Sequence, residues 1–114
     1  MNVKKVEASW GHEVHWAANE KYTAKILHIN YGQTKKRGHH VAKDKTIYVL
    51  QGILILELGA NQAKNNQPDK TKILETGESY RIKPGVIHRF VAPKECYVRL
   101  VQISTSEKDD FVEL

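Results

Sequence analysis

The stretch GHHVAKDKTIYVLQG, residues 38–52, places two adjacent histidines ahead of an alternating apolar run that ends at a glycine. Successive side chains of a β-strand point to opposite sides, so Lys45, Ile47 and Val49 share one face of the strand that this run predicts. The opposite face also carries large apolar groups, and both faces therefore need cover. We expect this strand to lie in a closed double sheet, or to be covered on its outer face by a partner subunit.

Short runs of β-branched and aromatic residues recur along the chain, whereas helical periodicity is nearly absent. Besides 45–51, these runs are residues 22–29, 53–58, 71–76, 79–82, 88–92 and 96–104. Glycine and proline separate them, most clearly at Gly52, Gly77 and Pro84-Gly85. Many short strands divided by such turn residues predict an all-β sandwich or barrel.

The length of 114 residues fits one domain, which we place at residues 1–114. No apolar run is long enough for a transmembrane helix, so no membrane contact is expected. The first residues include lysines without an apolar stretch behind them, and no signal peptide is predicted. The single cysteine, Cys96, cannot form an internal disulfide. We therefore expect a cytoplasmic protein.

The chain is basic, with 18 lysines and arginines against 13 acidic residues and a formal charge of +5. A nucleic-acid partner would rest on this net charge alone, because the lysines are spread along the chain. No helix-turn-helix pattern, paired-cysteine zinc module or aromatic-rich RNA-binding signature accompanies them. Nucleic acid is therefore an unfavoured partner, and salt-sensitive binding to DNA or RNA would be its test.

Two ordered motifs are similar to those of the cupin family. The first reads Gly32-x5-Gly38-His39-His40-x4-Lys45-x6-Gly52. The second reads Gly77-x5-Lys83-Pro84-Gly85-x2-His88. Two motifs in this order, each with matching internal spacing, are much more specific than either alone.

The resemblance extends to both ends of the chain. SWGHEVHW, residues 9–16, is similar to the opening of small single-domain cupins described as mannose-6-phosphate isomerase-like. Residues 75–114, with a serine-threonine and double-aspartate tail, resemble their closing half. The resemblance implies a cupin double-stranded β-helix, a small jelly-roll barrel of the cupin 2 conserved barrel family. It also implies sugar isomerase chemistry in carbohydrate metabolism.

The chain departs from this family at the implied metal ligands. The family motifs supply three histidines and a glutamate, of which only His40 and His88 remain. Gly38 stands at the first histidine position and Lys45 at the glutamate position. His39 falls between motif positions, where strand alternation directs it to the face opposite His40.

These departures disfavour a complete metal centre. A catalytic zinc or iron site needs at least three protein ligands. At about 4 Å and an effective dielectric of about 20, a lysine ammonium repels a divalent ion by roughly 8 kcal/mol. The cofactor is therefore either none or an unidentified divalent metal (Zn, Fe, Mn or Ni) on the incomplete pair His40 and His88.

An inward Lys45 would create an anion site, because its ammonium would lie beside two imidazoles. Burial would also favour the neutral amine, which can act as a base. Alternatively, the Lys45 chain end extends outward to solvent. We expect Arg89 to add bidentate phosphate contact if it lies at the barrel mouth. The resemblance gives Lys25 a pocket role, against a solvated one, so the substrate-binding set is Arg89, Lys25 and Lys45.

Two functional hypotheses follow. In the first, the chain is a small cupin that binds a phosphorylated sugar or similar anionic metabolite, with aldose–ketose isomerisation as the implied reaction. Lys45, His40 and His88 are then the candidate catalytic residues, one of them a base, with Arg89 or a residual metal as the electrophile. In the second, the chain is a non-catalytic cupin binding module with a degenerate metal site. A homodimer is expected in either case, because strands with two apolar faces need cover.

Overall fold

The computed structural model describes residues 2–65, 67–108 and 110–114, and these form eleven β-strands and one short 3₁₀ turn, η1 (Gln62–Lys64). The strands are β1 (Lys4–Ala8), β2 (Gly11–Ala18), β3 (Tyr22–Ile29), β4 (Gly38–His40), β5 (Lys45–Gln51), β6 (Leu54–Leu58), β7 (Lys70–Leu74), β8 (Ser79–Ile82), β9 (His88–Val91), β10 (Val98–Thr105) and β11 (Phe111–Glu113). The all-β expectation is confirmed. No helix in the described part of the chain is long and apolar enough to cross a membrane.

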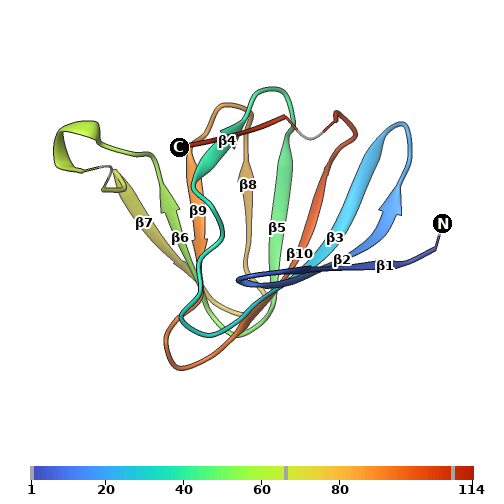
Figure 1. Cartoon of the computed structure of the whole chain (residues 1–114), viewed down its shortest axis with the longest axis horizontal. Coiled ribbons are helices and arrows are strands. Elements are labelled where there is room, and N and C mark those ends of the chain that lie inside the picture. The colour runs from blue at the N-terminus through green and yellow to red at the C-terminus, as the bar shows by residue number, and fades with distance from the viewer. Residues whose placement is uncertain (1, 66, 109) are drawn as a thin grey trace.

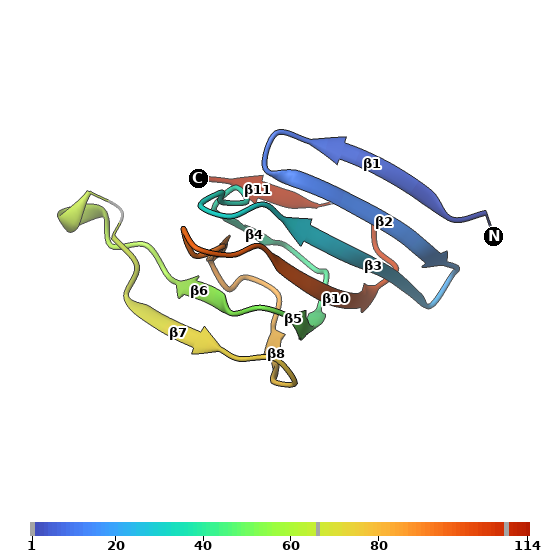
Figure 2. The same cartoon turned by 90° about the horizontal axis from the view of Figure 1, so that it is seen from below.

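The strands form two antiparallel sheets that face each other (Figure 1). One sheet has six strands in the order β1-β2-β3-β10-β5-β8, and the other has five in the order β11-β4-β9-β6-β7. Figure 2 shows β1 and β7 at opposite edges of the molecule. Strands distant in sequence are neighbours, as where β10 lies between β3 and β5. This double sheet is the predicted jelly-roll barrel.

The predicted strands agree closely with the observed ones in the middle of the chain. The runs 22–29, 45–51 and 79–82 match β3, β5 and β8 residue for residue. The predicted runs do not include β1, β2, β4 or β11, although strand alternation was applied to His39 and His40 in β4. Of these, β4 and β11 have three residues each, too short for alternation to be visible, and β1 is largely exposed.

The inner faces of the sheets are apolar at one end of the barrel and polar at the other. On β5, Ile47 and Val49 are fully buried in the core, whereas Lys45 begins the same inward face. On β10, Leu100 is followed on the inward face by Gln102 and Ser104. Because β10 runs antiparallel to β5, Ser104 pairs with Lys45 and both polar ends meet. The apolar half is a closed core, and the polar half holds a cavity.

Candidate functional site

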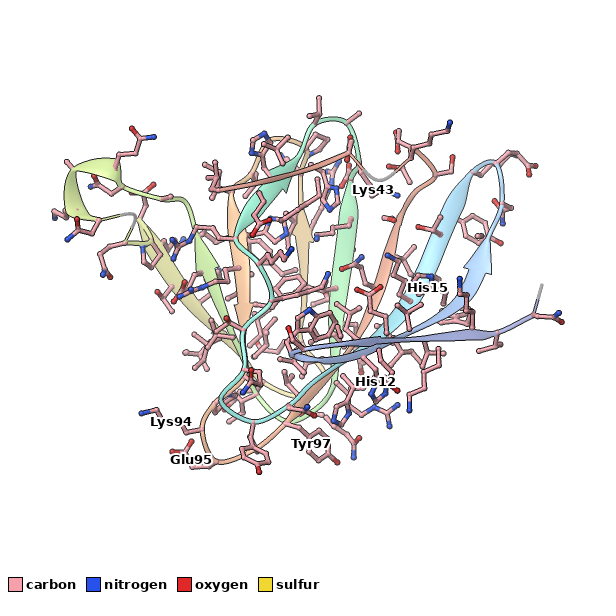
Figure 3. All side chains as sticks on the ribbon, viewed as in Figure 1. His12, His15, Lys43, Lys94, Glu95 and Tyr97 are labelled. Carbon is pink, nitrogen blue, oxygen red and sulfur yellow. The ribbon has the colours of Figure 1, made fainter. Side chains whose placement is uncertain are left out.

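The cavity at the polar end has a volume of about 370 Å³. This lies in the range of small-molecule sites, about 300 to 1,000 Å³. Five lysines line it, namely Lys25, Lys35, Lys36, Lys43 and Lys45. Figure 3 shows Lys43 at the end of the molecule away from Tyr97, and His15 and His12 on opposite sides of β2. His15 faces the cavity, and His12 lies on the outer face of the sheet.

Lys45 points into this cavity. Its side chain is only 3% exposed, and its Nζ lies 3.4 Å from His40 Nε2. The same Nζ lies 5.1 Å from the centre of the Phe90 ring, within reach of a cation–π interaction. The inward direction follows from strand alternation, because Lys45 shares the face of the buried Ile47. The Lys45 charge also acts on His88, whose ring centre lies 6.3 Å from that of His40.

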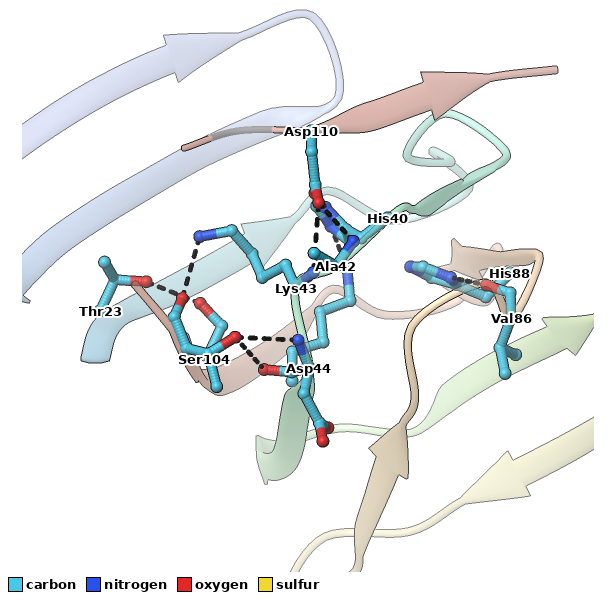
Figure 4. A network of polar contacts seen from close by, with 11 residues as sticks. Thr23, His40, Ala42, Lys43, Asp44, Val86, His88, Ser104 and Asp110 are labelled. Carbon is cyan, nitrogen blue, oxygen red and sulfur yellow. Dashed lines mark hydrogen bonds and ion pairs between the residues drawn. The ribbon is translucent and has the colours of Figure 1, made fainter. Parts of the chain in front are cut away.

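His40 is held in place by Asp110, as Figure 4 shows. His40 Nδ1 lies 2.8 Å from Asp110 Oδ1, while the other carboxylate oxygen accepts hydrogen bonds from the backbone amides of Ala42 and Lys43. Burial raises the pKa of Asp110, but the Ala42 amide, the His40 ring and the Lys43 amide outweigh it and lower this pKa. An ionised carboxylate only accepts hydrogen bonds, so His40 Nδ1 carries a proton, and Nε2 is the ring nitrogen that faces Lys45.

His88 is buried on the opposite wall, with 3% of its surface exposed. Its Nδ1 donates a hydrogen bond of 2.9 Å to the Val86 carbonyl, as in Figure 4. Burial, the Lys45 charge and the nearby His40 lower the pKa of His88 to about 3, although the Val86 hydrogen bond opposes the shift. His88 is therefore neutral at physiological pH, and its Nε2 is the unprotonated nitrogen.

Glu13 is the acidic member of the cavity wall, and the sequence analysis did not assign it a role. Its carboxylate lies 2.8 Å from His15 Nε2, 3.4 Å from Lys25 Nζ and 3.5 Å from Lys35 Nζ. Burial raises the pKa of Glu13, but Lys35, the His15 hydrogen bond and Lys25 together lower it to about 2. The available signal was the two-residue spacing of Glu13 and His15, which puts both on one face of a strand.

Gln102 was also missed, and its side chain faces the cavity from β10. It is 5% exposed, and its Oε1 meets no hydrogen-bond donor among the residues that the structure describes. A buried amide oxygen without a donor is costly, about 1 to 3 kcal/mol. A ligand hydroxyl at this position would satisfy it.

The predicted substrate-binding residues lie in different places. Lys25 lines the cavity together with Lys45. Arg89 follows His88 on β9, so it points to the outer face, where its Nε donates a 2.8 Å hydrogen bond to Glu57. Strand alternation explains this placement, and Arg89 does not line the cavity.

The donor set does not fit the metal that the sequence resemblance implies. A side chain at Gly38 would overlap the Val112 carbonyl oxygen, and its Cβ would lie 2.6 Å from Phe111 Cζ, because β11 covers this position. Lys45 places an ammonium against His40 Nε2, where a cation would have to bind. In residues 2–65, 67–108 and 110–114, no three His, Cys, Asp or Glu side chains are arranged to hold a metal ion.

The fold and this cavity together define a jelly-roll barrel with a basic cavity at one end. The solved structure of KdgF from Halomonas sp. is similar, with a TM-score of 0.75 and 18% identity, over 96% of this chain and 90% of that one. An RmlC-like cupin from Shewanella frigidimarina gives a TM-score of 0.77 at 19% identity, over 96% and 89% of the two chains. An oxalate oxidase in complex with the substrate analogue glycolate gives 0.67 at 16% identity, over 82% of this chain and 46% of that chain.

At these identities, the likeness shows the fold alone. No curated protein matches the sequence. Residues 25–104 match the cupin domain family, Cupin_2, and the chain belongs to this family. The expected cupin double-stranded β-helix is thereby confirmed.

Proposed function

We propose that this cupin binds a phosphorylated sugar or a similar anionic metabolite in the cavity between its sheets. The observation that carries the proposal is the charge of the cavity wall. Among the described residues that line it, five are lysines and one, Glu13, is a carboxylate. The formal charge of these groups is +4 (five minus one), which a phosphate or carboxylate ligand would offset.

Other features of the wall suit the remainder of such a ligand. Trp10 and Phe90 supply apolar surface for a carbon skeleton, and Gln102 supplies the unsatisfied amide oxygen for a hydroxyl. The position of Lys45 among buried groups makes it the strongest single anion contact in this proposal.

Calorimetric titration with mannose 6-phosphate tests the proposal, and mannose is the uncharged comparison. A hydrogen bond to a charged group contributes about 1.5 to 3 kcal/mol, so Lys45→Met should weaken mannose 6-phosphate binding by about tenfold or more. Lys94→Met is the matched control, because this exposed lysine does not line the cavity. Equal binding of mannose and mannose 6-phosphate, or equal affinities of Lys45→Met and wild type, would contradict the proposal.

The finer proposal is a mannose-6-phosphate isomerase-like activity. Aldose–ketose isomerisation moves a proton between C1 and C2, which needs a base and a cation near the developing enediolate. A histidine of the cavity wall, His40 or His88, would supply the base, and Lys45 the cation. Arg89 takes no part in this version, because it is paired with Glu57 on the outer face. Wash-in of deuterium at C2 of mannose 6-phosphate in D₂O, followed by NMR, measures the proton transfer directly.

The second candidate function is a non-catalytic binding module. The misfit between the donor set and a metal ion favours it, because the family motif's ligands are replaced at positions 38 and 45. Ligand binding without deuterium wash-in would select this candidate. Glycolate belongs in the ligand panel, since an oxalate oxidase of similar fold binds it.

A further inference from the structure

Lys45, His40 and Asp110 form a chain of successive polar contacts that anion binding alone does not require. The Lys45 amine lies 3.4 Å from His40 Nε2, and His40 Nδ1 lies 2.8 Å from Asp110. Activated nucleophiles share this layout: a nucleophile within reach of a base, and the base oriented by a third group. The separation of His40 from Asp110 by 70 residues shows that the tertiary fold, and not local sequence, assembles the arrangement.

The side chain of Lys45 is also buried, and other cations lie near it. Its side chain is buried against the Phe90 ring, and the charges of Lys45 and Lys35 both act on the neighbouring His88. Desolvation and nearby cations are the two means by which proteins make lysine amines nucleophilic. His40 can receive the proton because Asp110 stabilises the resulting imidazolium.

We propose that Lys45 is a covalent catalytic residue, which forms an imine with the carbonyl carbon of an anionic aldehyde or ketone bound in the cavity. This inference rests on the proposed function, because the lysine-lined wall selects the anionic part of the ligand. The open-chain form of a sugar phosphate contains both groups. The cavity volume of about 370 Å³ suits a molecule of that size.

The step balances without an oxidant or reductant. His40 Nε2 takes a proton from the Lys45 ammonium, and the amine attacks the carbonyl carbon to form a C–N bond. His40 returns this proton to the carbonyl oxygen. It then takes a second proton from the nitrogen, and the product is a neutral carbinolamine. That proton then goes to the hydroxyl, the C–O bond breaks, and water leaves a protonated imine on Lys45. His40 ends as it began, and one water is released for each imine.

The probe for this inference is D-glyceraldehyde 3-phosphate with sodium cyanoborohydride, which reduces an imine to a stable amine. An ordinary lysine, with a pKa of about 10.4, has roughly one neutral amine in 2,500 at pH 7. We therefore expect Lys45 to be labelled at least about tenfold faster than the exposed Lys94, as measured by peptide mass spectrometry. His40→Gln should slow the labelling of Lys45 by about tenfold and leave that of Lys94 unchanged.

Binding of glucitol 6-phosphate separates this inference from the proposed function, because this ligand has the phosphate but no carbonyl. If it binds and Lys45 is not labelled faster than Lys94, imine formation is refuted and the anion site stands. If it does not bind, the proposed function fails. Loss of its binding in His40→Gln would assign His40 a structural role only, and would contradict the proton transfer. In Lys45→Met, intact-mass analysis should show only the slow reductive labelling that exposed lysines undergo.

Discussion

Acid should destabilise this protein through His88, in a pH window set by its lowered pKa. The pKa of His88 is about 3 in the folded protein, against an ordinary value of 6.5. The folded state binds no proton at His88 between these values, whereas the unfolded state does. Stability is therefore fully present above about pH 6.5 and falls as the pH drops toward 3. At about 1.4 kcal/mol for each pH unit, acidification from pH 7.5 to pH 5 should cost about 2 kcal/mol.

Urea unfolding of wild type and His88→Gln at a series of pH values measures this loss. Glutamine can still donate a hydrogen bond to the Val86 carbonyl but does not titrate. His28 also has a lowered pKa, because of burial and of the neighbouring His12 and Arg99, so only the difference between the two proteins isolates His88. His39→Gln, on the opposite face of β4 from His40, is the matched control. An equal loss of stability in His88→Gln and wild type down to pH 5 would refute the assignment.

Three further predictions concern the metal, the ligand and the oligomeric state. Lys45→Glu removes the ammonium and adds a carboxylate beside two histidines. After incubation with zinc, we therefore expect this variant to hold nearly one zinc ion per chain and the wild type to hold little. Equal zinc contents of the two proteins, measured by plasma mass spectrometry, would contradict the donor-set argument. Gln102→Leu should weaken mannose 6-phosphate binding by about fivefold and leave inorganic phosphate binding unchanged in calorimetry, because it removes one hydroxyl contact. Ile103→Lys should convert the proposed homodimer to monomers in light scattering, since Ile103 is 48% exposed on the outer face that also carries Tyr48, which is 43% exposed. An unchanged mass would place the interface elsewhere.

The strands in the middle of the chain could be predicted because their side chains alternate, as on β5, where buried and exposed residues alternate, and because their turns contain glycine and proline. Alternation correctly grouped Lys45 with Ile47 and Val49, but could not decide whether its chain end points inward or turns outward to solvent. That outcome depends on the barrel's other strands, which bring Ser104 beside Lys45 from 59 residues away (104 minus 45). Arg89 directly follows His88 in its strand, so alternation predicts that the two side chains point to opposite faces. The structure places Arg89 on the outer face.

Asp110 belongs to the double-aspartate tail of the family resemblance, but nothing in the sequence indicated its contact with His40. Its contact with His40 exists because β11 pairs with β4, and β11 has three residues. Glu13 likewise acquires its role only when β2 pairs with β3 and brings Lys25 close. Charged groups in short or edge strands are usually solvated. Sequence alone therefore favours a solvent-exposed side chain for both residues.

Pairing of β11 with β4 links the loss of the metal ligands to the new arrangement at Lys45. The strand lies so close to Gly38 that a side chain there would overlap its backbone, which removes the first histidine position. The same strand begins beside Asp110, whose carboxylate orients His40 and thereby directs Nε2 toward Lys45. A cation at this Nε2 would face the Lys45 ammonium, whereas an anionic carbonyl compound would be attracted to it. One short strand thus both closes the metal position and orients the histidine on which the proposed amine chemistry depends.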